Sequence, residues 1–396
     1  MSHMNCFDKT SLRIIFIAIV LLAVPVSYAE QLSADPNDPC FPKQTALFRK
    51  LEVLEAWEYT RGDPNILIGV IDNGFDHYHP DLKGQLIPGF YSNGGYHTEC
   101  FENIAHGTMT TSIIAAKADN NIGMAGLAPN CRILTASLGT LEHEIVILRK
   151  KYRKSPELLQ KEMQNQRERL ENFGIQWLRY QMRALTNAIH YLVDHNVRVI
   201  NCSIGGWEQW ASANDEKAKL QRAFSYAEEK DVIIVISAGN SAIKIDSFPV
   251  SSKLVLIVGA SLLNDTRWEV SRSIKGQTMK FGSNFGSVLD VVAPIDRLQV
   301  CVPHDERMYN IQSGPYGATN HPFRGDCLTM PNGATSEAAP IVTSLIALCY
   351  SVNPEIKARS IIDLIKNNCD DIGDPGVDIY TGYGRINFRK TIESAK

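Results

Sequence analysis

The sequence predicts an α/β protein in which a parallel sheet is covered by helices on both faces. Short apolar runs rich in β-branched residues recur along the chain, and such runs are typical of strands buried on both faces. Amphipathic segments with helical spacing lie between most of them, such as residues 183–196 and 219–230. This alternation favours a parallel sheet, because each parallel connection must cross over the sheet. The expected strands are residues 66–71, 131–138, 197–204, 232–238 and 254–260.

Composition and charge exclude some classes of function. The chain has 396 residues, of which 44% are apolar and 21% are charged, as in an ordinary globular protein with a sizeable core. A formal net charge of −3 gives no support for a nucleic acid or an anionic membrane surface as partner. A Gly-rich phosphate loop does not follow the first strand, so nucleotide binding has little support. We expect a single domain over residues 30–396.

The N-terminus is typical of a secretory signal peptide over residues 1–29. Lys9 and Arg13 precede an apolar run of about 13 residues, and the small residues Ser27 and Ala29 follow it. A membrane anchor is the alternative, but a span needs ~20 apolar residues. The sequence therefore predicts cleavage after Ala29, a secreted or periplasmic protein and no stable membrane span.

Residues 141–180 do not fit the strand and helix alternation. This stretch is rich in charge, its apolar residues recur at helical spacing, and residues 155–157 read Ser-Pro-Glu, a good helix start. We expect one or two amphipathic helices inserted between a strand and its crossover helix. The insert is either a stabilising appendage or an arm that binds a protein partner or the substrate.

Cysteine usage permits disulfides. The chain has nine cysteines, and Cys6 would leave with the signal peptide, so an even number remains in the exported chain. A Cys-x-x-Cys spacing does not occur, which gives a zinc site little support. Cys301 and Cys327 flank a polar loop and are the pair we expect to be bonded.

Polar residues with complementary chemistry stand at the ends of predicted elements. Asp72 follows the first strand, His106 opens a small-residue helix, and Ser336 opens an apolar helix. Singly, each is more often a cap or a core residue. Jointly, they match nucleophilic catalysis, because serine needs an adjacent base and the base needs a carboxylate to hold its tautomer. The order Asp, His, Ser along the chain is that of subtilisin.

The motifs around these residues resemble those of the subtilisin-like serine peptidases, or subtilases. The resemblance runs from about residue 44 to residue 396, with the insert outside it, and rests on several blocks in the family's order. It implies a three-layer α/β/α fold and a serine endopeptidase that acts on proteins or peptides through an acyl-enzyme, with no cofactor for catalysis. The matching blocks are residues 70–82, 106–129, 199–206, 232–240, 281–294, 333–340 and 382–387.

The resemblance also implies a role for each matching residue. Ser336 would be the nucleophile, His106 the general base and Asp72 the group that orients His106. The side-chain amide of Asn240 and the backbone N–H of Ser336 would bind the oxyanion. The substrate backbone would pair with Ser203, Ile204 and Gly205 as an added strand.

A structural calcium site and a specificity pocket are two further implications. Asp81, the Asn120 side chain and the carbonyls of Ala118, Ile122 and Met124 match the positions of a calcium site; the alternative is that Asp and Asn only form a loop here. Ser247 matches the floor of the primary specificity pocket, and its small size leaves room for a large substrate side chain. Asp246 beside it suggests Lys or Arg before the cleaved bond.

The chain departs from the family pattern around the nucleophile. Ala334 stands where the family has Gly, and a turn that needs positive φ would strain it. Glu337 directly follows Ser336, and a carboxylate there would oppose negative charge on the oxyanion. Residues 108–112 after His106 also differ from the family motif. These departures leave an alternative open, a catalytically impaired pseudoenzyme that binds a peptide or a partner.

Overall fold

The computed structural model describes residues 35–92, 106–138, 155, 157–158, 161, 174–205, 207, 214–274, 277–302 and 327–396. The predicted signal peptide and most of the predicted insert lie outside these residues.

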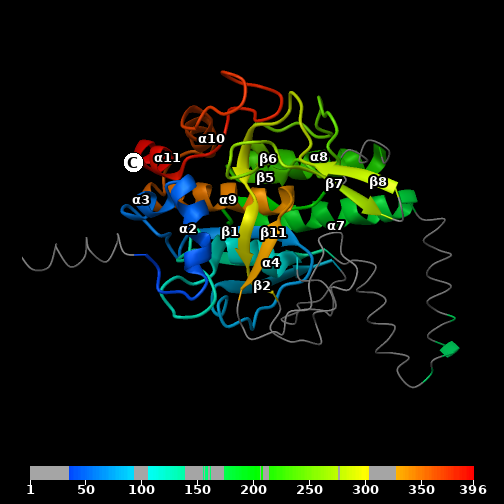
Figure 1. The fold of residues 1–396 in the computed structure, drawn as a ribbon. Helices are drawn as coiled ribbons and strands as arrows, with labels where there is room; N and C mark the ends of the chain where they lie inside the picture. The colour runs from blue at the N-terminus through cyan, green and yellow to red at the C-terminus, as the bar shows by residue number, and fades with distance from the viewer. Residues whose placement is uncertain are drawn as a thin grey trace, which may run out of the picture.

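A seven-stranded parallel sheet forms the centre of the molecule (Figure 1), which confirms the predicted fold class. Its strand order is β2-β3-β1-β4-β5-β6-β9, so β1 lies inside the sheet between β3 and β4. The strands are β1 (Leu67–Asp72), β2 (Leu86–Tyr91), β3 (Arg132–Ser137), β4 (Val199–Cys202), β5 (Ile233–Ser237), β6 (Val255–Ser261) and β9 (Val291–Pro294).

The five predicted strands are all present. The structure also contains strands that the sequence analysis did not predict. β2 contains Pro88 and is only partly buried, so its sequence lacks the apolar run that marks a central strand. Two antiparallel hairpins lie outside the main sheet, β7 (Glu269–Ile274) with β8 (Gln277–Gly282), and β10 (Asp296–Val300) with β11 (Leu328–Asn332).

Helices cover both faces of the sheet. α7 (Gly174–Asp194) and α8 (Asn214–Glu229) pack on each other, with α7 against β1, β2 and β3 and α8 against β5. α4 (His106–Ala115) and α9 (Thr335–Val352) lie on the other face. The other helices in the described part of the chain pack around this second face and are α2 (Phe41–Lys50), α3 (Val53–Trp57), α10 (Ala358–Asn367) and α11 (Phe388–Ala395).

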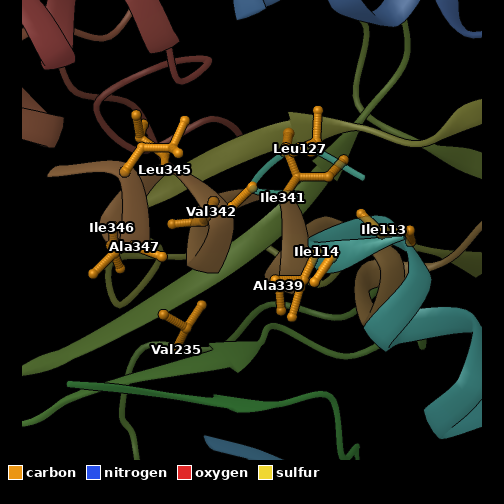
Figure 2. Packing of buried hydrophobic residues seen from close by; sticks show 14 of the residues in the cluster. Ile113, Ile114, Leu127, Val235, Ala339, Ile341, Val342, Leu345, Ile346 and Ala347 are labelled. Atoms are coloured by element: carbon orange, nitrogen blue, oxygen red, sulfur yellow. The ribbon is translucent and has the colours of Figure 1, made fainter. Parts of the chain in front are cut away.

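The core is densest around α9. Ile341, Val342 and Leu345 of α9 lie near Ile114 of α4 and above Val235 of β5 in Figure 2. Alternate residues of each strand face opposite cores, as the pleat requires: Val235 belongs to the α9 side, whereas its neighbours in β5 belong to the α7 side. Among the described residues α9 has the length and composition of a membrane span, but 83% of that segment is buried inside the molecule.

The end of the predicted insert belongs to the crossover helix. α7 begins at Gly174 and continues to Asp194 without interruption, so it includes residues that the sequence analysis assigned to the insert. Residues 174–180 are therefore the first turns of α7 and not part of a separate insertion. In the sequence, charged and apolar residues follow the same helical spacing on both sides of Gly174, so composition does not mark where α7 begins.

The expected disulfide between Cys301 and Cys327 is wrong. Cys327 is bonded to Cys40 at the start of α2, with a Cα–Cα separation of 6.5 Å. Cys301 is buried and free, and its N–H donates to Ser112 Oγ of α4 at 2.9 Å. Val300 pairs with Leu328, so the two cysteines lie close together, but the Cys301 thiol donates to Asp81 Oδ2 at 3.7 Å while Cys327 is bonded to Cys40. Cys100 lies outside the described residues.

Candidate active site

The carboxyl ends of the parallel strands and the starts of two helices meet at one edge of the sheet. Asp72 is the last residue of β1, His106 is the first of α4, and Ser336 lies in the first turn of α9. His106 Nδ1 donates to Asp72 Oδ1 at 2.7 Å. The structure thus joins two of the predicted site residues directly and places the third on the neighbouring helix.

The carboxylate of Asp72 is buried and well supplied with donors. It is 1% exposed. Besides the His106 ring, the N–H of Asn73 donates to Oδ1 at 2.6 Å, and Thr110 Oγ1 donates to Oδ2 at 3.0 Å. Thr110 was not predicted, although it lies four residues after His106 and hence on the same side of α4. The donors fix the carboxylate in the position that orients the imidazole.

A glycine lets α4 approach the end of β1. A Cβ at Gly107 would lie 2.6 Å from the Gly74 carbonyl oxygen and 2.7 Å from the Phe75 ring. The N–H of Gly107 also donates to the Asn73 carbonyl at 2.9 Å. Only glycine therefore allows the backbone contact that brings His106 to Asp72.

Pro340 frees a backbone acceptor beside the nucleophile. Proline at this position of α9 has no N–H to donate to the carbonyl four residues earlier, which is that of Ser336. Ser203 Oγ donates to this carbonyl at 2.7 Å instead. In return, Ser336 Oγ donates to the Ser203 carbonyl at 3.3 Å. The predicted substrate-binding strand and the predicted nucleophile are thus locked together by their own hydrogen bonds.

Asn240 is oriented by the residue that precedes the nucleophile. Its Oδ1 accepts the N–H of Thr335 at 3.0 Å and the hydroxyl of Thr335 at 2.6 Å. Since both contacts go to the oxygen, the NH₂ group of Asn240 remains for a developing oxyanion. Thr335 was not predicted as a site residue, although its position directly before Ser336 in the sequence could have indicated it.

The departures around the nucleophile are accommodated. Ala334 has φ −138° and ψ −177°, which is extended backbone, so the expected strain does not arise. Glu337 does not point into solvent: it is 2% exposed, and its Oε2 accepts the N–H of Ala334 at 2.5 Å as in a capping box. Its Oε1 lies 3.9 Å from His106 Nε2.

The charges around His106 make its ring a strong base. Burial by itself lowers the pKa of His106, but the negative charges of Asp72 and Glu337 and the hydrogen bond to Asp72 outweigh it and raise the pKa to about 9. Burial raises the pKa of Glu337, and the neighbouring imidazolium opposes that effect.

The predicted specificity residues lie on an exposed segment. Asp246 pairs with Lys244 at 2.9 Å and accepts the hydroxyl of Ser287 at 3.1 Å, so its charge already has partners. Ser247 beside it is exposed. A preference for Lys or Arg stays a prediction, and the pairing with Lys244 weakens the attraction that Asp246 would offer.

A tryptophan that the sequence did not single out fills the space behind this segment. Trp207 is 1% exposed, and its Nε1 donates to the Ser237 carbonyl at 3.0 Å. Its ring packs edge-on against Phe248, which follows Ser247, with ring centroids 4.9 Å apart. The indole therefore bridges the carboxyl ends of β4 and β5 next to the predicted pocket floor.

The predicted calcium ligands lie together, but the Asp81 carboxylate already has N–H donors. Asn120 Nδ2 donates to its Oδ1 at 2.8 Å and Met124 N–H to its Oδ2 at 2.9 Å. The Asn120 oxygen in turn accepts the N–H of Ile122 at 2.7 Å. Calcium needs several oxygen ligands, and in this arrangement the side-chain oxygens of Asp81 and Asn120 accept N–H groups instead. Within the described part of the chain, we find no cluster of three or more His, Cys, Asp or Glu that could hold a metal. Calcium at these positions, the carbonyl of Ala118 included, stays a prediction.

A buried carboxylate, an imidazole and a helix-borne serine at the carboxyl edge of a parallel sheet define the class of serine hydrolases with an Asp, His, Ser order. The model of the subtilase family, Peptidase_S8, matches residues 63–384. The chain therefore belongs to the subtilases, a family of serine peptidases, which confirms the resemblance.

Curated relatives agree with this assignment. The chain is 26% identical to thermitase of Thermoactinomyces vulgaris over 90% of this chain and 99% of that protein. It is 28% identical to a thermophilic serine proteinase of Bacillus sp. (strain AK1) over 84% of this chain and 63% of that protein, and 28% identical to the cell wall-associated protease of Bacillus subtilis (strain 168) over 83% of this chain and 31% of that protein. The match thus spans nearly all of thermitase but less than two thirds of the other two.

Solved structures share the fold. A lanthipeptide protease superposes with a TM-score of 0.63 at 20% identity, covering 92% of this chain and 99% of that one. Fervidolysin of Fervidobacterium pennivorans superposes with a TM-score of 0.62 at 22% identity, covering 91% of this chain and 47% of that one.

Proposed function

We propose that this subtilase is an exported serine endopeptidase that hydrolyses peptide bonds through Asp72, His106 and Ser336. The hydrogen-bonded pair of Asp72, which is buried, and His106 beside the N-terminus of α9 carries this proposal. Serine is a weak nucleophile, and this pair supplies both a base of raised pKa and the carboxylate that stabilises its protonated form.

The first step requires a rotation of the nucleophile. Ser336 Oγ leaves the Ser203 carbonyl and turns to His106 Nε2, which takes its proton as Oγ attacks the substrate carbonyl. The oxyanion is bound by the Asn240 NH₂ group and the Ser336 N–H, and the positive end of α9 adds to the same attraction. His106 then protonates the leaving amine, and an acyl-enzyme on Ser336 remains. Water, activated by His106, releases the acid and restores Ser336.

The substrate binds as an extended strand. Ser203, Ile204 and Gly205 follow β4 at the edge that carries the site, and a Cβ at Gly205 would meet nothing within 4 Å. This open backbone suits an added strand of a protein or peptide, which supports an endopeptidase. The departures that favoured a binding-only pseudoenzyme are accommodated, so we do not favour that alternative.

Hydrolysis of quenched fluorescent peptides by wild type, Ser336→Ala and His106→Ala tests the proposal. We expect each variant to lose about 10⁶ of kcat, because the groups act as a unit. Ser351→Ala is the matched control: its serine lies at the far end of α9 and donates to the Ala347 carbonyl at 2.7 Å, so activity should persist. Full activity in Ser336→Ala would overturn the proposal.

We propose that residues 1–29 are a signal peptide that is removed on export. N-terminal sequencing of the exported protein should then show Glu30 as its first residue, and a first residue of Met1 would contradict the signal peptide. A partner role for the 141–180 insert predicts that deletion of residues 143–173 alters the cleavage of folded proteins more than that of short peptides.

A further inference from the structure

Two carboxylates flank the imidazole of His106. Asp72 Oδ1 accepts from Nδ1 at 2.7 Å, and Glu337 Oε1 lies 3.9 Å from Nε2, the nitrogen that must take the proton of the nucleophile. The catalytic scheme above uses Asp72 and leaves Glu337 without a role. A buried carboxylate beside a catalytic base is costly unless it interacts with a charge.

The local backbone fixes the Glu337 carboxylate in this place. Oε2 accepts the Ala334 N–H at 2.5 Å, and the side chain is 3% exposed. Gly333 leaves room for it, since a Cβ there would lie 3.3 Å from Oε2. The carboxylate is thus anchored by one oxygen to the turn before α9 and presents the other to His106.

The hydroxyl of the nucleophile is engaged by another residue in this arrangement, because Ser336 Oγ donates to the Ser203 carbonyl at 3.3 Å. The charged group next to Nε2 is Glu337. A protonated His106 therefore has an anionic partner on each edge, whereas a neutral His106 gains little from the second one.

We propose that Glu337 is a positioning residue for His106: its carboxylate holds the Nε2 edge of the ring in the resting molecule and favours the imidazolium until Ser336 displaces it. This inference rests on the proposed peptidase function and goes beyond the usual triad. It predicts an enzyme whose activity develops at alkaline pH.

Other charged groups on the packed elements do not share this role. β1 contributes only Asp72, and α4 and α9 contribute only His106 and Glu337. On β3, Arg132 is exposed and donates to the Pro64 carbonyl. On β10, Asp296 accepts the N–H of Leu263 and Arg297 is exposed.

The direction of the pH effect follows from the sign of the charge. Asp72 and Glu337 raise the pKa of His106 to about 9, against its burial. The base form is needed for catalysis, so kcat/KM should rise as the pH increases through that value. Removing the Glu337 charge removes one of the raising effects, so the midpoint should fall by about one pH unit.

The experiment combines an NMR titration with a pH–rate profile. The NMR signal of the His106 ring is assigned by its absence in His106→Gln. Its titration is then followed in two proteins, Ser336→Ala and the double variant Ser336→Ala with Glu337→Gln. Gln retains an oxygen that accepts the Ala334 N–H. Glu216→Gln is the matched control, because Glu216 is also buried in the first turn of a helix, α8, and pairs there with Lys219 at 3.2 Å. The acid limb of kcat/KM is measured in the same variants with Ser336 intact.

We expect Glu337→Gln to lower both midpoints and Glu216→Gln to leave them unchanged. The inference is overturned if the titration midpoint of His106 is the same with Glu337 and with Gln at this position. It is also overturned if the midpoint in the protein that retains Glu337 lies near 6.5. The titration needs no turnover, so a molecule that fails to cleave peptides but shows the shift would contradict the proposed function alone. If Glu337→Gln does not fold, Glu337→Met serves as the second neutral variant.

Discussion

At the residue scale, the site depends on which atom of each side chain is already occupied. Asn240 shows this most clearly, because Thr335 takes both contacts through the Asn240 oxygen and leaves its NH₂ group available. Ser336 shows the opposite case, because its hydroxyl is engaged by Ser203 and must be released before it can react. The sequence predicted the identity of these residues but not these partners, since the partners come from segments far apart in the chain.

Replacing Asn240 tests the oxyanion site. Asn240→Ala removes the amide donor, and the loss of one such donor lowers kcat by about 10²–10³ while KM changes little. Steady-state kinetics on one peptide substrate measure both values. A KM that rises at constant kcat would instead assign Asn240 to ground-state binding.

Ala334 marks a limit of reasoning from residue type alone. The Gly-to-Ala departure suggested strain, which would arise only at positive φ, and the backbone there is extended. Backbone dihedrals depend on the neighbouring turn between β11 and α9, and no sequence pattern specified that turn.

At the scale of elements, buried runs were easier to predict than edges. The central strands β1, β4, β5 and β6 were predicted because burial on both faces demands continuous apolar sequence. The hairpin of β7 and β8 was not predicted, since β8 is largely exposed and lacks an apolar pattern. Trp207 was missed for a related reason: it follows β4 outside any periodic segment, and only the fold brings it against Phe248.

Trp207 should limit the size of the substrate side chain before the cleaved bond. Trp207→Ala removes the indole that bridges the ends of β4 and β5 and leaves room for a larger substrate side chain. The kcat/KM for cleavage after Phe should therefore rise by about tenfold or more relative to that for cleavage after Ala, which is the usual effect of added apolar contacts in a pocket. The ratio of kcat/KM for two peptides that differ at this position is the measurement, because partial unfolding cancels in a ratio.

Trp57→Phe controls for the general effect of losing a buried indole. Trp57 is also fully buried, and its Nε1 donates to the Leu127 carbonyl at 3.0 Å, away from the site. The ratio should stay the same in this variant. An unchanged ratio in Trp207→Ala would show that the indole lies outside the specificity pocket.

At the scale of the whole molecule, an ion-pair network joins the two ends of the described chain. Arg385, 7% exposed, pairs with Asp265 and, at 2.8 Å, with Asp370. Lys50 at the end of α2 also binds Asp265 at 2.6 Å, and Lys390 of α11 binds Asp370 at 2.6 Å. The network closes the layer of helices that supports α9, and it was not predicted, because its members are separated along the chain.

Removal of Arg385 should destabilise the fold in a pH-dependent way. Arg385→Met leaves two partly exposed carboxylates with fewer partners, at a cost of about 1–3 kcal/mol in the free energy of unfolding at pH 7. Burial raises the pKa of Asp265, but Lys50 and Arg385 together lower it below its ordinary value of 3.8. A lowered carboxyl pKa stabilises the fold above the unfolded value, and this contribution is lost as the pH falls through the folded value.

Urea unfolding at pH 7 and pH 3 measures the effect. The difference between wild type and Arg385→Met should shrink at pH 3. Arg359→Met is the control, because its pair with Asp363 is exposed and should contribute less than about 1 kcal/mol. Equal costs for the two substitutions at pH 7 would contradict the importance of the network.

A peptidase of this class requires Ser336 to be a nucleophile that His106 activates. The most direct measurement is labelling of the folded protein with a fluorophosphonate, followed by mass spectrometry of the labelled peptide, for wild type, Ser336→Ala and His106→Ala. We expect one phosphonate on Ser336 in the wild type and none in either variant. Absence of label on Ser336 in the folded wild type, or equal labelling in His106→Ala, would contradict the claim.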